Sequence, residues 1–199
     1  MHFGKLRVLN DDIVAPGKGF GLHLHENMEI VTIPLEGRLA HTDSTGYEQT
    51  IAPNEVQVMS AGTGIWHSEH NHSQDENVRL LQIWVLPDEK GHEPRYDQKS
   101  YNAAQRQGRF QTLVAPGGGD VLSLNQQVVF SRIDLADQSA EYRLRNSVHG
   151  VYVFVISGEV AANDIQLEMR DGLGVWDVDA VTLASSSAAE ILLIEIPMR

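Results

Sequence analysis

The chain has 199 residues, a net charge of -12 and no cysteine, and its composition of 42% hydrophobic and 21% charged residues is that of a globular protein. The lack of cysteine excludes disulfides, zinc ribbons, iron–sulfur clusters and thiol nucleophiles, and the negative charge argues against direct binding to nucleic acid. No apolar run reaches the roughly 18 residues of a membrane span and no signal peptide is recognisable, so we expect a cytosolic protein.

The first half of the sequence reads as short strands separated by turn residues. A strand is expected over residues 5–9, ended by the turn residues Asn10, Asp11 and Asp12. The His-x-His strand should follow the glycine-containing loop at 16–21. Further strands are expected at 28–35, 38–41, 48–51, 55–60, 65–69 and 78–86.

Residues 88–108 are polar and contain Pro94, which favours a connector with one short helix near 101–107. Many short strands and scarce helical periodicity predict an all-β fold of sandwiches or barrels. Beyond the connector, strands are expected at 110–115, 128–135, 151–157, 160–162, 165–167, 175–177, 181–184 and 190–196.

Two stretches of the first half recur in the second half. Residues 62–69 (GTGIWHSE) align with residues 172–179 (GLGVWDVD), and residues 35–40 align with residues 156–161. This repeat predicts two copies of one β unit. We place an N-terminal metal-binding unit at residues 1–90, a connector at 91–109 and a degenerate C-terminal unit at 110–199.

The second copy lacks the histidines of the first, so we expect it to bind no metal. Asp177 and Asp179, which stand in place of two of the ligands, are expected to lie at a solvated strand end rather than to bind a metal. The alignment pairs His23 with Leu144, His25 with Asn146, His67 with Asp177 and Glu69 with Asp179.

Two short motifs place side chains that can bind a metal: His23-Leu24-His25 and His67-Ser68-Glu69. Residues at i and i+2 of a strand point to the same face, so two such strands side by side would bring three imidazoles and one carboxylate together. This mixed nitrogen and oxygen set suits Fe, Mn, Ni, Cu or Zn, and in an octahedral site it leaves positions for a substrate. A structural zinc site would instead be closed, tetrahedral and often cysteine-bearing.

The spacing of these residues resembles the two motifs of the cupin superfamily, with Gly62 where the second motif usually begins with proline. Three longer segments are more specific: HLHENMEIVT (23–32), LEGRLAHTDSTG (35–46) and VQVMSAGTGIWHSEHN (56–71). In these segments the chain resembles the pirin family, and within it the bacterial quercetin 2,3-dioxygenase-like members. The resemblance continues through residues 78–86 and 94–96 and, more weakly, through 192–197.

The resemblance implies an all-β bicupin, with two jelly-roll-like barrels in tandem and one divalent metal, usually iron, in the first. By position, the ligands would be His23, His25, His67 and Glu69. Many other cupins have their carboxylate ligand where Glu29 stands, so Glu29 is a second candidate. Either glutamate is a candidate base for the proton of a substrate hydroxyl.

The function implied by the resemblance is a dioxygenase that opens a flavonol such as quercetin. The alternative is a non-catalytic metalloprotein that responds to iron or redox state and acts through a protein partner. A metal-free binder of small molecules is a third possibility. The dioxygenase and the non-catalytic metalloprotein need the same ligands, so the sequence does not distinguish these two functions. It does not indicate the oligomeric state either. Pirins generally carry a further aromatic-rich segment before the strand that here begins at Lys5, which implies an internal start or a trimmed chain.

The other histidines are expected to be ordinary surface or core residues. His70 and His72 adjoin the second motif but should point away from it if strand alternation holds. Trp66 and Trp176 occupy matching positions of the repeat, so each is expected to pack inside its barrel. No partner is expected for His149. The remaining histidines with this ordinary interpretation are His2, His41 and His92.

Overall fold

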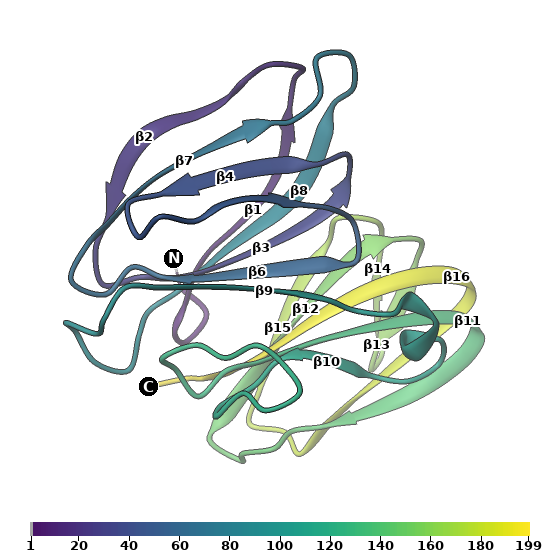
Figure 1. Ribbon diagram of the computed structural model, residues 1–199. Coiled ribbons are helices and arrows are strands. Elements are labelled where there is room, and N and C mark those ends of the chain that lie inside the picture. The colour runs from purple at the N-terminus through teal and green to yellow at the C-terminus, as the bar shows by residue number, and fades with distance from the viewer. Residues whose placement is uncertain (1) are drawn as a thin grey trace.

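The computed structural model describes residues 2–199 as two β-rich bodies (Figure 1). The N-terminal half, purple to teal in Figure 1, forms the first body, and the C-terminal half, green to yellow, forms the second. The single helix within residues 2–199 is the 3₁₀ turn η1 (Ala103–Arg106). Within that range no helix has the length and apolar character needed to cross a membrane. The predicted all-β class is confirmed.

The first body consists of two sheets in which all paired strands are antiparallel. The larger sheet runs in the order β1 (Leu6–Val14), β8 (Val78–Val85), β3 (Glu29–Glu36), β6 (Glu55–Ser60) and β9 (Arg95–Ser100). The smaller sheet runs in the order β2 (Gly19–His25), β7 (Ile65–Asn71), β4 (Leu39–Asp43) and β5 (Glu48–Ile51).

The second body is one antiparallel sheet dominated by two long strands that pair with each other, β11 and β16. Its path runs β10 (Gln111–Val114), β11 (Val129–Arg143), β16 (Ala180–Pro197), β12 (His149–Ser157) and β15 (Gly172–Trp176). Off this path, β13 (Val160–Ala162) pairs with β16 and with β14 (Ile165–Leu167).

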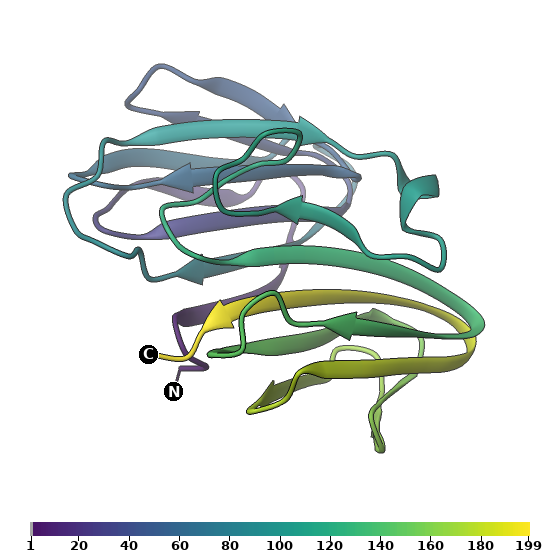
Figure 2. The same cartoon turned by 90° about the horizontal axis from the view of Figure 1, so that it is seen from below.

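Strand alternation gives the central strands two buried faces. In β3, Val31 joins a core shared by both bodies, whereas Ile30 packs with Ile65 of the smaller sheet. In β16, Leu192 joins the shared core and Leu193 fills the interior of the second body. Strands covered on both faces read as continuous apolar runs, which explains why residues 190–196 lack an alternating pattern. Figure 2 shows the two bodies stacked, with the long strands of the second running beneath the first.

Most predicted strands have their counterparts in the structure, and the bounds of β5, β6, β13 and β14 agree exactly with the prediction. Several predictions are wrong. Residues 19–21, expected in a loop, belong to β2, and the strand expected to end at residue 135 continues to Arg143 as β11. Residues 10–12 are not a turn but continue β1, because they pair with residues 80–82 of β8. Residues 95–100, expected in the connector, form β9 and pair with β6. The strands expected at 181–184 and 190–196 are one strand, β16, whose polar middle is paired with β11.

Candidate metal centre

The two sequence motifs lie on adjacent strands of the smaller sheet. β2 pairs antiparallel with β7, and His23 stands opposite His67. His67 and Glu69 are buried inside the first body, and His23 and His25 are half-buried at its edge. The spacing of two residues therefore places both members of each motif on one face of the strand, as predicted.

The three imidazoles of these motifs converge. The ring centroids of His23 and His67 are 4.3 Å apart, and those of His25 and His67 are 5.0 Å apart. The Nε2 atoms of His23 and His25 lie 3.1 Å from each other. One ring nitrogen from each histidine lies within 4.8 Å of the other two, so a single cation could contact all three.

A backbone contact fixes the orientation of His23. Its Nδ1 lies 2.7 Å from the carbonyl oxygen of Gly21. Because a carbonyl can only accept, Nδ1–H is the donor, which leaves Nε2, the nitrogen that faces His25, as the atom that can bind a metal. A hydrogen bond of this kind orients the ligating histidines of metal proteins.

His67 is the most deeply buried of the three imidazoles. Within residues 2–199 neither of its ring nitrogens has a hydrogen-bond partner. Burial, followed by the neighbouring charge of His23, lowers the pKa of His67 to about 3 and that of His25 to about 4. Both rings are therefore neutral at pH 7 and keep free lone pairs. Because a buried polar group without a partner is costly, this donor set fits a metal ion.

Glu69 is held in place by a short chain of side-chain hydrogen bonds. Its Oε2 accepts a hydrogen bond of 2.7 Å from Gln82, whose own Oε1 accepts one of 3.1 Å from the indole of Trp84. Its Oε1 has no partner within the described residues. Burial raises the pKa of Glu69 to about 7. The carboxylate thus has one fixed oxygen and one oxygen free to bind a cation or a proton.

His41 belongs to the same interior, although we expected an ordinary residue near a turn. It is fully buried on β4, opposite Glu69, and its ligand atom lies within 4.8 Å of those of His67 and Glu69. Its Nε2 is 2.9 Å from Oδ2 of Asp43. The alternation of Leu39, His41 and Asp43 on the inner face of β4 was the sequence signal that could have identified it.

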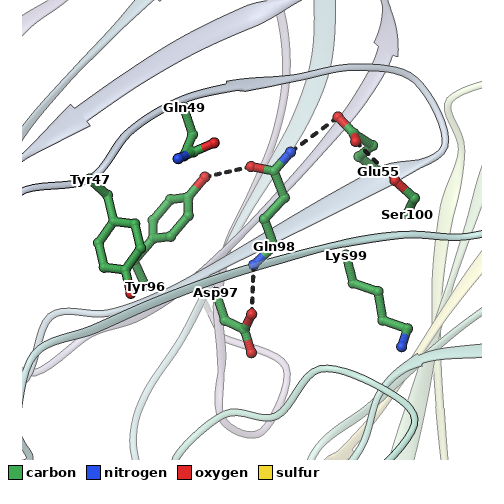
Figure 3. Close-up of a pocket in the computed structure, with 8 residues that line it drawn as sticks. All are labelled: Tyr47, Gln49, Glu55, Tyr96, Asp97, Gln98, Lys99 and Ser100. Carbon is green, nitrogen blue, oxygen red and sulfur yellow. Dashed lines mark hydrogen bonds between the residues drawn. The ribbon is translucent and has the colours of Figure 1, made fainter.

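A pocket of about 320 Å³ lies on the far side of His41, between β5 and β9 (Figure 3). The ring of Tyr96 lies between His41 and Tyr47, with centroid separations of 4.9 and 4.8 Å. The hydroxyl of Tyr96 donates to Gln98, whose amide donates to Glu55, as Figure 3 shows. Two aromatic layers therefore separate this pocket from His67.

Glu29 does not join the histidines, which corrects the prediction that it is a second candidate ligand or base. It shares the face of β3 that carries Val31 and is 1% exposed. Its Oε2 accepts from the hydroxyl of Ser60 at 2.7 Å and from the backbone of Asn125 at 3.1 Å, and its Oε1 accepts from the side chain of Asn125 at 3.1 Å. Alternation along β3 turns Glu29 away from the site, where it ties the first body to the segment before β11.

Replacing Glu29 with alanine is therefore expected to destabilise the fold. The change leaves the buried donors of Ser60 and Asn125 without an acceptor, at a cost of about 2–4 kcal/mol. Urea denaturation followed by tryptophan fluorescence measures the effect. Ser60→Ala, which removes one of these donors, should cost about 1 kcal/mol. Equal stability of Glu29→Ala and the unchanged protein would contradict this role.

The second body shows no counterpart of the histidine cluster among the described residues. Asp177 and Asp179, which the repeat aligns with His67 and Glu69, are exposed. His149 does have a partner, contrary to expectation: its Nδ1 lies 3.2 Å from Oε1 of the fully buried Glu195, on the interior face of β16.

The two repeat-matched tryptophans are not inside their barrels as predicted. Trp66 is 48% exposed and Trp176 is 55% exposed. Because His67 faces inward, the residue before it on β7 must face outward. The same alternation leaves His70 exposed, as expected, and His72 beyond the strand is also exposed.

The fold and the comparisons with known proteins together define a bicupin. The family model described as Pirin matches residues 1–85, and the model described as Quercetinase C-terminal cupin domain matches residues 112–196. The chain is 38% identical over 198 residues to the quercetin 2,3-dioxygenase of Escherichia coli strain K12, covering 99% of this chain and 84% of that protein. It is 35% identical over 198 residues to a pirin-like protein of Caulobacter vibrioides, covering 98% and 84%.

Solved structures agree with the sequence comparisons. The crystal structure of YhhW from Escherichia coli superposes with a TM-score of 0.94 at 38% identity, covering 99% of this chain and 83% of that one. The bacterial pirin YhhW in complex with nickel(II) gives a TM-score of 0.92 at 37% identity, covering 99% and 84%. The chain belongs to the pirin family.

Proposed function

We propose that this pirin binds one divalent transition metal through His23, His25, His67 and Glu69 and acts as a dioxygenase on a flavonol such as quercetin. The observation that carries the proposal is the convergence of three imidazoles, one of them buried without a partner among the described residues, beside a carboxylate with a free oxygen. The relatives named quercetin 2,3-dioxygenase support the choice of reaction.

Iron is the metal we propose for the cell. The donor set is compatible with several first-row metals, because imidazole and carboxylate accept Fe, Mn, Ni, Cu and Zn alike. The nickel(II) complex of a relative supports metal binding in this family without selecting iron.

The bound metal would supply the Lewis-acid and redox chemistry of ring opening. The protein would hold its ligands in place: the contact with Gly21 orients His23, and Gln82 orients the carboxylate of Glu69. Because Oε2 of Glu69 is held by Gln82, its free Oε1 would either bind the metal or accept the proton of the flavonol hydroxyl. The indole of Trp84, edge-on to His25 with ring centroids 4.9 Å apart, gives an apolar wall to the site.

Metal analysis combined with oxygen uptake tests this function. Protein purified without chelators should contain about one metal per chain and consume oxygen when quercetin is added, and stripping the metal should abolish uptake. Refilling with Fe(II) should restore uptake, with the same protein incubated without flavonol as the control. Stoichiometric metal with no uptake would contradict the dioxygenase and favour the regulatory alternative. No bound metal would contradict both.

A further inference from the structure

A second polar cleft lies between the two bodies, away from the histidine cluster. It has a volume of about 370 Å³, within the range of small-ligand sites. Its walls come from the ends of β3 and β8 in the first body and from β11, β16 and the β14–β15 turn in the second. Four arginines line it, although the whole chain has only 15 lysines and arginines and a net charge of -12. They are Arg79, Arg106, Arg132 and Arg170.

Among these arginines, Arg106 makes the most hydrogen bonds to the protein, so its role is structural. Its Nε lies 2.9 and 3.0 Å from the two carboxylate oxygens of Asp134, and its Nη1 donates to Asn54 at 2.9 Å. These contacts fix Arg106 as part of the wall and join η1 to both bodies.

Arg132 is buried with most of its donors unused. Its side chain is 6% exposed, and within residues 2–199 its one side-chain hydrogen bond runs from Nη2 to Glu190 at 2.6 Å. Its Nε is buried with no partner in that part of the chain. A guanidinium has five N–H donors, so most of the N–H groups of Arg132 lack an acceptor and could bind one in the cleft. Burial and the neighbouring charge of Arg106 both lower its pKa, and a bound anion would offset both effects.

The remaining two arginines are also poorly satisfied. Nε of Arg170 lies 3.2 Å from Asp11 of β1, and its buried Nη1 has no partner among the described residues. Arg170 has a φ of +75°, a backbone conformation that favours glycine, and its side chain reaches across from the second body to the first. Arg79 approaches Glu36 only at 4.0 Å. Neighbouring carboxylates thus balance much of the charge but leave many N–H donors free.

We propose that this cleft binds a small oxyanion with two or more anionic oxygens, of the phosphate or dicarboxylate class, between Arg79, Arg132 and Arg170. Guanidinium groups match the paired oxygens of such anions and form short, charge-assisted hydrogen bonds with them. Because the arginines come from both bodies, the bound anion would hold the two bodies together. Its contacts are separate from the histidine cluster, so binding should not require the metal.

Titration of the full chain with inorganic phosphate and with succinate, at fixed ionic strength set by chloride, tests the proposal. Isothermal titration calorimetry should show saturable binding of at least one of them, and the melting temperature should rise along the same curve. Preference for phosphate or for succinate identifies the anion class. Arg170→Gln and Arg79→Gln should each weaken binding by about tenfold, and the double variant should weaken it further.

Arg143→Gln is the matched control, because it removes the same charge from an exposed arginine whose partner is Glu141. It should bind the anion as the unchanged protein does, and all variants should keep the metal content of the unchanged protein. If neither anion binds above chloride, or if Arg143→Gln weakens binding as much as Arg170→Gln, the cleft is not an anion site.

Discussion

His67→Ala is expected to lose its metal and its oxygen uptake with quercetin, whereas His70→Ala keeps both. The two histidines are three residues apart on β7, but His67 is fully buried in the imidazole cluster and His70 is exposed on the opposite face. His67 also belongs to both groups of residues that could hold a metal. One group is His67 with His23 and His25, the other is His67 with His41 and Glu69, and the ligand atoms within each group lie within 4.8 Å of one another. Removal of His67 breaks both groups.

The expected size of the His67 effect follows from metal-site energetics. Changes to groups that merely orient a ligand typically cost 10–100-fold in metal affinity, so loss of a central ligand should cost more than about a hundredfold. Elemental analysis after gel filtration gives the metal per chain, and an oxygen electrode gives turnover. Circular dichroism of both variants controls for folding. Full metal content in His67→Ala, with a normal spectrum, would place the metal elsewhere.

The sequence predicted the histidine cluster because its geometry is local. A spacing of two residues fixes the face of each motif, and one strand pairing between β2 and β7 then brings the motifs together. The turn residues likewise fixed most strand bounds, since glycine and asparagine with positive φ, such as Gly37 and Asn54, interrupt strands locally.

The failures of prediction depend on contacts between distant segments. The role of Glu29 is set by Asn125, a partner from the other half of the chain that no local pattern indicates. The polar strand β9 exists because β6 offers it a free edge. The arginines of the cleft are scattered through the sequence and meet only where the two bodies pack together. Such arrangements are decided by tertiary packing, which local periodicity does not encode.

Glu69→Gln should reduce turnover by about 10²–10⁴-fold, the usual contribution of a positioned base, whereas Glu29→Gln should leave turnover nearly unchanged. Both glutamates are buried and both changes remove one carboxylate. Only Glu69 faces the imidazoles, with an oxygen free of hydrogen bonds among the described residues. Glutamine at position 69 keeps the size and an amide oxygen but loses the charge and the ability to take up a proton.

Metal content separates the two roles proposed for Glu69. If it is a ligand, Glu69→Gln should lose metal affinity along with turnover, and if it acts as the base alone, the metal should stay while turnover falls. Glu29→Gln should show its effect in denaturation instead, since Glu29 is bonded to Ser60 of β6 and ties the first body to Asn125, in the segment before β11. Full turnover in Glu69→Gln would exclude Glu69 from both roles. In that case His41, which shares the inner face with His67, becomes the fourth ligand to test, because its ring already lies 5.4 Å from that of His67.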